Sequence, residues 1–204
     1  MAEVVTKRAT YADIEAAPEG LIAEIINGEL VLQPHPTPRH NTVATVLISE
    51  LMQLFRRGPA GPSGWFFLFE TEVKFGDDLL VPDIAGWRVE RLPQLPETNW
   101  ISTRPDFVCE VLSRSTEKRD RTAKSDIYAD AGVPHYWLID PRRQTFEAFE
   151  LGTGRWQPTG NWRADDIVSA KPFEQIEISL ASLWPFDRPL GFNEEPQALF
   201  EDDR

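Results

Sequence analysis

Residues 106–140, DFVCEVLSRSTEKRDRTAKSDIYADAGVPHYWLID, decide the fold. The apolar run over 106–112 predicts a strand buried in a sheet, and the shorter run over 135–139 predicts a second one. Between them, residues 120–131 repeat small and apolar side chains at helical spacing, and a glycine follows. The stretch therefore alternates strand, helix and strand, which is typical of a sheet with helices packed against it.

The segments before this stretch complete the predicted core. Apolar residues recur at three- and four-residue steps over 40–57, which predicts a long helix with one buried face. Two strand-like runs follow, over 65–75 and 79–87. The core order is therefore αβββαβ, and it predicts an α/β fold in which helices flank a mixed sheet.

Shorter elements surround this core. Residues 11–17 predict a short helix, and the apolar runs 21–26 and 29–33 predict an N-terminal hairpin. The hairpin turn is Asn27-Gly28, a dipeptide that accepts positive φ at both central positions of a type I′ turn. Peripheral C-terminal strands are predicted over 145–151, 167–168 and 176–180.

Length and composition indicate one globular domain. The chain has 204 residues, of which 41% are hydrophobic and 26% charged. We expect a single domain over 1–192, with its core at about 40–140, and an acidic tail over 193–204. Because no apolar run could span a bilayer and the lone Cys109 excludes an intramolecular disulfide, we expect a soluble, cytoplasmic protein without a membrane partner.

Charge is distributed unevenly along the chain. The formal net charge is −12, and residues 165–204 alone carry ten acidic and three basic side chains. This balance argues against tight nonspecific binding to polyanions. Residues 114–124, however, carry a net positive charge and form a basic stripe on an acidic protein, which indicates a local binding role. The stripe contains Arg114, Lys118, Arg119, Arg121 and Lys124.

Two carboxylates interrupt the apolar strands. Asp83 lies within residues 79–85, and Glu110 lies within 107–112. Burial of an ionised carboxylate costs several kcal/mol unless it is paired, hydrogen-bonded or bound to a metal, so a structural ion pair would explain either acid alone. Two such acids on strands about 4.8 Å apart could instead aim at one cation. With a backbone carbonyl they would leave most of an octahedral shell open, as Mg²⁺ prefers, and such an ion promotes hydrolysis.

A cation that supports the transition state is the third expected member of such a site. Lys124 is the candidate, because it lies on the helix that directly follows the Glu110 strand. Arg121 and Tyr128 lie three residues before it and four after it, so the three form a polar strip beside the buried face. The alternative is an ordinary helix surface with solvated basic side chains.

These residues carry a resemblance to a known family. The segments concerned are Val81-Pro82-Asp83, residues 105–113, Ser115-Thr116, Lys124, Tyr128-Ala129 and residues 132–140. They resemble the Uma family, which is classed with the restriction-endonuclease-like PD-(D/E)XK nucleases, and the likeness covers roughly residues 11–151. It implies an αβββαβ core in which Asp83 and Glu110 bind Mg²⁺ or Mn²⁺ and the Val111 carbonyl is the third ligand.

The chain also departs from the superfamily pattern. Position 112 is leucine where the superfamily lysine should stand, and Lys124 resembles a lysine relocated to the following helix. Glu24 and His40 match positions that this family tends to keep, so both are accessory candidates, together with Tyr128. A local hydrogen bond for Glu24 and a helix cap for His40 are the alternatives.

Two further departures, Arg114 and His135, replace the family's usual proline and glutamate near the expected site.

The sequence thus predicts a metal-dependent endonuclease that hydrolyses phosphodiester bonds in DNA. Asp83, Glu110 and Lys124 form its catalytic set, and Arg114, Lys118, Arg119 and Arg121 contact phosphates. Restriction-like enzymes commonly dimerise to cut two strands, so a homodimer is compatible with this function. The alternative is a catalytically decayed nuclease fold that binds nucleic acid or protein, which the leucine at position 112 would favour.

Overall fold

A mixed six-stranded sheet forms the centre of the protein. The computed structural model describes residues 8–55 and 64–185, and the sheet order is β11-β10-β9-β8-β6-β3. These strands are β3 (Trp65–Phe69), β6 (Ile84–Arg88), β8 (Phe107–Val111), β9 (His135–Asp140), β10 (Thr145–Leu151) and β11 (Trp156–Arg163). β8 pairs with β9 in parallel and with β6 in antiparallel orientation. The predicted mixed sheet is confirmed.

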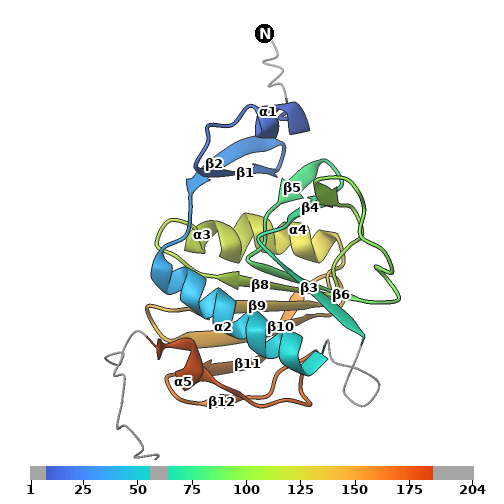
Figure 1. Ribbon diagram of the computed structural model, residues 1–204. Coiled ribbons are helices and arrows are strands. Elements are labelled where there is room, and N and C mark those ends of the chain that lie inside the picture. Colours follow the sequence, from blue (N-terminus) through green and yellow to red (C-terminus); the bar gives the residue numbers. More distant parts are fainter. Residues whose placement is uncertain (1–7, 56–63, 186–204) are drawn as a thin grey trace, which may run out of the picture.

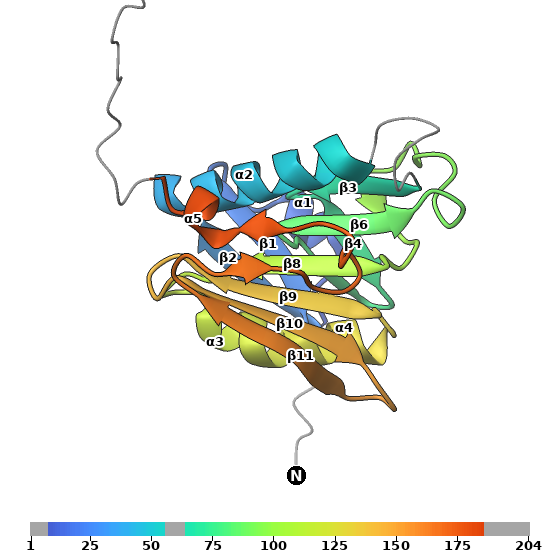
Figure 2. The ribbon, with the colours of Figure 1, turned by 90° about the horizontal axis from the view of Figure 1, so that it is seen from below.

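Helices cover both faces of this sheet, as Figure 2 shows. α2 (Pro38–Phe55) packs on one face, where its apolar side meets Cys109 and Val111 of β8. A helical run of α3 (Glu117–Arg119), η1 (Asp120–Lys124) and α4 (Ser125–Asp130) packs on the other. The order of α2, β3, β6, β8, this run and β9 is the predicted αβββαβ core.

A second sheet of five strands stands beside the core, with the order β2-β1-β5-β4-β7 (Figure 1). Its strands are β1 (Leu21–Ile26), β2 (Glu29–Pro34), β4 (Glu72–Phe75), β5 (Asp78–Leu80) and β7 (Trp100–Ile101). β1 and β2 form the predicted hairpin, and Asn27 and Gly28 have φ angles of 54° and 78°. Both angles match the type I′ turn expected from this dipeptide.

The predicted strands over 65–75 and 79–87 were wrong as single elements. Each is divided between the two sheets, the first into β3 and β4 and the second into β5 and β6. Glu70 breaks the first run with a left-handed φ of 42°, and Pro82, which has no N–H for a sheet ladder, lies in the second break. Asp83 consequently lies at the bend before β6, at the junction of the two sheets.

Smaller boundaries also differ from the predictions. α1 (Tyr11–Glu15) is two residues shorter than expected, and the predicted strand over 176–180 divides into β13 (Ile178–Ser179) and α5 (Leu180–Leu183). β12 (Ile167–Val168) matches its prediction. β11 was missed because it lacks an apolar run and contains a proline, which an edge strand tolerates.

Two predictions lie outside the described residues, namely the end of the long helix after residue 55 and the acidic tail over 193–204.

Candidate functional site

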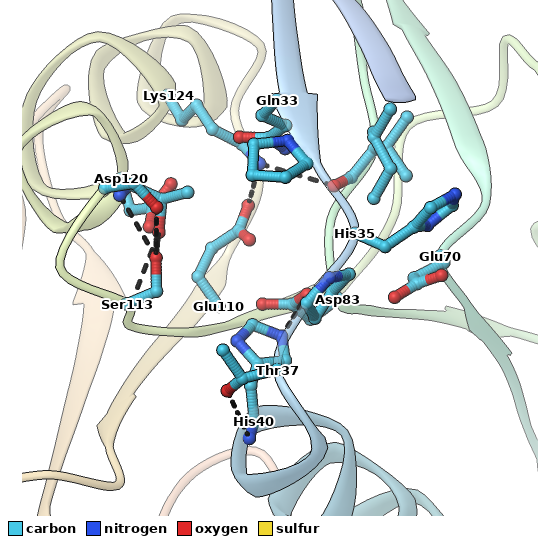
Figure 3. Close-up of a pocket in the computed structure, with 16 residues that line it drawn as sticks. Gln33, His35, Thr37, His40, Glu70, Asp83, Glu110, Ser113, Asp120 and Lys124 are labelled. Atoms are coloured by element: carbon cyan, nitrogen blue, oxygen red, sulfur yellow. Dashed lines mark hydrogen bonds and ion pairs between the residues drawn. The ribbon is translucent and has the colours of Figure 1, made fainter. Parts of the chain in front are cut away.

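A pocket opens where the two sheets meet the ends of α2 and the α3-η1-α4 run, with a cavity of about 100 Å³ (Figure 3). Its walls are Ile22, Gln33, Pro34, His35, Pro36, Thr37, His40, Glu70, Val81, Asp83, Glu110, Ser113, Ser115, Thr116, Asp120 and Lys124. Both strand acids singled out in the sequence therefore face one pocket, together with Lys124 and His40.

The register of the central sheet brings the two acids together. Ile84 of β6 is the pairing partner of Cys109 in β8, and the strands are antiparallel. Asp83 and Glu110 each stand one residue further along, at the same end of this strand pair. Both are buried, with 8% and 2% of their surface exposed.

Asp83 has two hydrogen-bond donors. The His40 ring donates through Nε2 to Oδ1 at 2.8 Å, and the Val111 N–H donates to Oδ2 at 2.6 Å. Burial lowers the pKa of His40, but the hydrogen bond and the charge of Asp83 outweigh it and raise the pKa above 6.5. Because the N–H and C=O of one strand residue point to the same edge, the Val111 carbonyl also faces this side.

His40 does not cap the long helix. The cap is the Thr37 hydroxyl, which accepts the backbone N–H of His40 at 3.4 Å. α2 begins at Pro38, two residues before the predicted start, and proline is favoured in the first turn. The His40 side chain is thereby directed into the pocket, and its buried Nδ1 has no hydrogen-bond partner among the described residues.

Glu110 is held from the opposite side, by the helical run. Lys124 Nζ lies 2.7 Å from Glu110 Oε1, and the Tyr128 hydroxyl donates to the same oxygen at 2.6 Å. Burial raises the pKa of Glu110 well above its usual value, and the charge of Lys124 opposes that rise. Tyr128, an accessory candidate from the sequence, thus contacts Glu110 without lining the pocket.

Lys124 is buried in the π-helical segment η1, a kind of segment that is frequent at functional sites. Its ammonium contacts Glu110 Oε1, Glu24 Oε1 at 3.0 Å and the Val81 carbonyl at 3.3 Å. Burial lowers the pKa of Lys124, but the two carboxylates outweigh it and raise the pKa. An ammonium has three protons, so all of them have acceptors here.

Glu24 belongs to the site rather than to a purely local hydrogen bond in the hairpin. It is fully buried in β1 and reaches Lys124, a hundred positions later in the chain. The Val81 N–H donates to its Oε1 at 2.8 Å, and Gln33 donates to its Oε2 at 3.3 Å. Glu24 is not among the residues that line the pocket.

Negative charge exceeds positive charge around Lys124. Glu24, Glu110 and Asp120 share this one buried ammonium, and burial raises the pKa of Asp120 to about 6, against the charge of Lys124. Such a donor set fits a hard divalent cation, which carboxylates bind. Over residues 8–55 and 64–185, however, no three His, Cys, Asp or Glu side chains form a preassembled metal cage.

The structure does not present the basic stripe as one continuous phosphate-binding row. Arg121 is bound by Glu147 of β10 and by Glu117, away from the pocket. Arg119 is partly buried and donates to Gln33 at 2.7 Å. Arg114 and Lys118 are exposed, and Arg114 lies between two serines of the pocket wall.

His135 is not near the site, contrary to the expectation. It begins β9 and pairs with Phe107, whereas Glu110 pairs with Leu138, three residues further along. At about 3.3 Å per residue, this separation is roughly 10 Å along the strand.

Sequence analysis missed several pocket residues, of which Glu70 is the most distinctive. Its buried Oε1 has no hydrogen-bond partner among the described residues. Burial raises the pKa of its carboxyl group, and the negative charge of Asp83 raises it further. Its backbone N–H donates to the Asp83 carbonyl at 3.2 Å. The only sequence signal was an acid directly after the apolar run 65–69. Ser113 and Thr116 lie in segments that carry the family resemblance, but the sequence assigned them no role in the site.

Comparisons with known proteins agree with this architecture. The Uma2 family model, described as "Putative restriction endonuclease", matches residues 8–181. A crystal structure of "a putative nuclease belonging to DUF820" from Anabaena variabilis ATCC 29413 superposes with a TM-score of 0.70 and 23% sequence identity. The alignment covers 86% of this chain and 97% of that one, so the likeness shows a shared fold.

No curated protein matched. In the two described ranges, no helix combines the length and the apolar character that a membrane crossing requires.

Proposed function

We propose that this chain, which belongs to the Uma2 family of restriction-endonuclease-like proteins, hydrolyses phosphodiester bonds in DNA with a divalent metal ion. The observation that carries the proposal is the position of Asp83 and Glu110. Asp83 directly precedes β6 and Glu110 is the next-to-last residue of β8, at the same end of this strand pair. Both line one pocket, and the buried Lys124 ammonium lies 2.7 Å from Glu110. Family membership supports nuclease chemistry, and the choice of DNA and metal rests on the chemistry of these side chains.

Asp83, Glu110 and the Val111 carbonyl are the groups that would hold Mg²⁺, with Mn²⁺ as a substitute. Each Asp83 oxygen accepts one hydrogen bond, so each keeps a lone pair for a cation. The bound ion would lower the pKa of a water and offset charge on the phosphoryl oxygens. His40 and the Val111 N–H orient Asp83 for this role, and Tyr128 orients Glu110.

Lys124 supplies a fixed positive charge at the pocket wall. Its three protons are already bound by Glu110, Glu24 and Val81, so it acts on a substrate phosphate through space unless it releases Glu110. A charge held in a buried site needs no reorganisation when negative charge develops on the phosphate. This arrangement fits the role expected of the lysine that is absent at position 112.

Arg114 and Lys118 are the side chains of the basic stripe that remain exposed for contact with a DNA backbone. Arg114 is flanked by Ser113 and Ser115, which line the pocket. Contacts of this kind position a duplex without reading its sequence. Arg121 is less suited to this role than the sequence indicated, because Glu147 binds its guanidinium.

Cleavage of a supercoiled plasmid tests the proposal. With about 5 mM Mg²⁺ or Mn²⁺, wild-type protein should nick the plasmid, and Asp83→Asn and Glu110→Gln should each reduce the rate at least about 100-fold. Asp77→Asn, which alters an exposed aspartate in an ion pair with Arg8, is the matched control and should cleave at the wild-type rate. Equal activity in all four proteins would identify a contaminant and refute the proposal.

The second candidate function is a nuclease fold that binds nucleic acid without cutting it. It is favoured by leucine at position 112 and by the partners of both acids, because Glu110 is paired with Lys124 and Asp83 with His40. Fluorescence anisotropy with a labelled duplex tests it. Affinity that falls with salt and with Arg114→Glu, in a protein that never cleaves, would support binding alone. Affinity that salt leaves unchanged would refute DNA binding.

A further inference from the structure

Glu24 has contacts that a structural glutamate of a hairpin does not need. It lies on β1, outside the αβββαβ core, yet its side chain is fully buried between the hairpin and η1. Its Oε1 accepts the Val81 N–H at 2.8 Å and lies 3.0 Å from Lys124 Nζ. The carbonyl of the same Val81 accepts from Lys124 at 3.3 Å. These three groups therefore close a ring of hydrogen bonds.

This ring connects the two halves of the site. Val81 precedes Pro82 and Asp83, so the backbone that leads to Asp83 is held by Glu24. Lys124 faces Glu110 on its other side. One carboxylate on the hairpin thus holds both the ammonium beside Glu110 and the segment that ends at Asp83.

The environment of Glu24 excludes direct contact with a substrate. Its exposed fraction is 0%, and it is absent from the pocket wall, whereas Lys124, Glu110 and Asp83 are part of that wall. A role in the reaction must therefore pass through a residue that Glu24 holds. Lys124 is that residue, because it is the buried cation nearest to Glu24.

Lys124 needs a second anion if Glu110 serves a metal ion. If Glu110 bound a divalent cation, its negative charge would be shared between that cation and Lys124. A buried ammonium without a counter-charge lowers the free energy of unfolding. Glu24 is fully buried and does not line the pocket, so it would keep its contact with Lys124. Glu110 would then serve the pocket, and Glu24 would pair with Lys124.

We propose that Glu24 is a positioning residue of the nuclease, which holds the Lys124 ammonium in place beside Glu110. The inference rests on the proposed function. It assigns the N-terminal hairpin to the active site, although the hairpin supplies none of the helices and strands of the αβββαβ order.

The test combines Glu24→Gln with its matched control, Glu29→Gln, an exposed glutamate of the same hairpin. Glutamine keeps the side-chain size and the acceptor for the Val81 N–H, removes the charge, and places an amide donor where Glu24 Oε2 accepts from Gln33. In plasmid cleavage, Glu24→Gln should lower kcat about tenfold or more and leave KM within about twofold, and Glu24→Asp should recover part of the loss. Glu29→Gln should match wild type. A changed KM with an unchanged kcat would overturn the proposal.

A double-mutant cycle separates an effect through Lys124 from an independent one. When Lys124→Met is present, adding Glu24→Gln should change kcat no further, whereas multiplied losses would overturn the proposal. A second readout does not need cleavage, namely the ¹⁵N–¹H NMR signal of the buried Lys124 ammonium. This signal should shift or broaden in Glu24→Gln and remain unchanged in Glu29→Gln. An unchanged signal in Glu24→Gln would show that Glu24 does not hold the lysine.

The two proposals fail in different ways. If the wild-type protein never cleaves but the Lys124 NMR signal responds to Glu24→Gln, the nuclease function is refuted. The role of Glu24 in the reaction is then refuted as well, and its contact with Lys124 is purely structural. A wild-type protein that cleaves, with Glu24→Gln as active as Glu29→Gln, would refute only the role of Glu24. Circular dichroism spectra that match wild type would show that each variant has folded.

Discussion

The two ends of the pocket differ in how completely their polar groups are paired. At the Glu110 end, Lys124 and Tyr128 hold the carboxylate, and every proton of the ammonium has an acceptor. At the Asp83 end, the carboxylate is bound, but two buried neighbouring atoms, His40 Nδ1 and Glu70 Oε1, have no partner in the described part of the chain. In Figure 3, Lys124 and Glu70 lie on opposite sides of the pocket.

The two ends therefore differ in their capacity to bind a ligand through polar contacts. Buried polar groups are nearly always hydrogen-bonded, so an unpaired one indicates strain, an absent water or ion, or a chemical role. At the Glu110 end, the polar groups are already paired with one another. A ligand would gain new polar contacts mainly at the Asp83 end, beside His40 and Glu70.

The largest expected effect comes from removing the charge at the paired end. Lys124→Met leaves Glu110 buried without its counter-charge and leaves Glu24 with only the more distant Arg119, 4.0 Å from its Oε2. The free energy of unfolding at neutral pH should therefore fall by about 3–5 kcal/mol. Urea unfolding measures this loss. Lys118→Met, on the exposed side of the same helical run, should stay within about 0.5 kcal/mol of wild type. A similar loss in both variants would contradict a specific charge network.

A smaller effect is expected when the paired end loses one hydrogen bond. Tyr128→Phe removes the hydroxyl that donates to Glu110 Oε1 at 2.6 Å in a fully buried position. The free energy of unfolding should fall by about 1.5–3 kcal/mol, as is usual for a hydrogen bond to a charged group. The control is Tyr11→Phe, which removes a longer bond to Glu72 in a half-exposed position and should cost less. Equal losses of unfolding free energy in Tyr128→Phe and Tyr11→Phe would contradict a special contribution of the buried Tyr128 hydrogen bond.

The smallest effect concerns the Asp83 end and depends on pH. Asp83 raises the pKa of His40 in the folded state, so the folded protein binds the proton more tightly than the unfolded chain. This stabilisation is complete below the ordinary histidine pKa of 6.5 and is lost as pH rises through the folded-state pKa. His40→Gln should therefore cost about 1 kcal/mol near pH 5.5 and less near pH 8.5.

Urea unfolding of wild type and His40→Gln at the two pH values checks this dependence. A cost that grows with pH would reverse the assignment of the His40 and Asp83 charges.

The core elements were predictable because their signals are local. The Asn27-Gly28 turn and the apolar spacing of the long helix led to the correct hairpin and the αβββαβ order. The division of the runs 65–75 and 79–87 was not predictable in this way. An apolar strand looks the same in either sheet, and only packing decides where the chain leaves one sheet for the other.

The candidate site was predictable to the extent that its residues are chemically out of place in the sequence. Asp83 and Glu110 were found because they interrupt apolar runs, and Lys124 because it follows them on a helix. The partners had no such signal. The pairing of Lys124 with Glu24 and of Arg121 with Glu147 joins residues that are far apart in the chain.

The sequence by itself determined the αβββαβ order of the core and the burial of Asp83 and Glu110, because periodicity and hydrophobicity act over a few neighbouring residues. Only the tertiary structure decided which charges neutralise one another. The register of β6 with β8, the π-helical segment and the position of the hairpin set those distances, and Coulomb energies depend on distance and burial rather than on order along the chain.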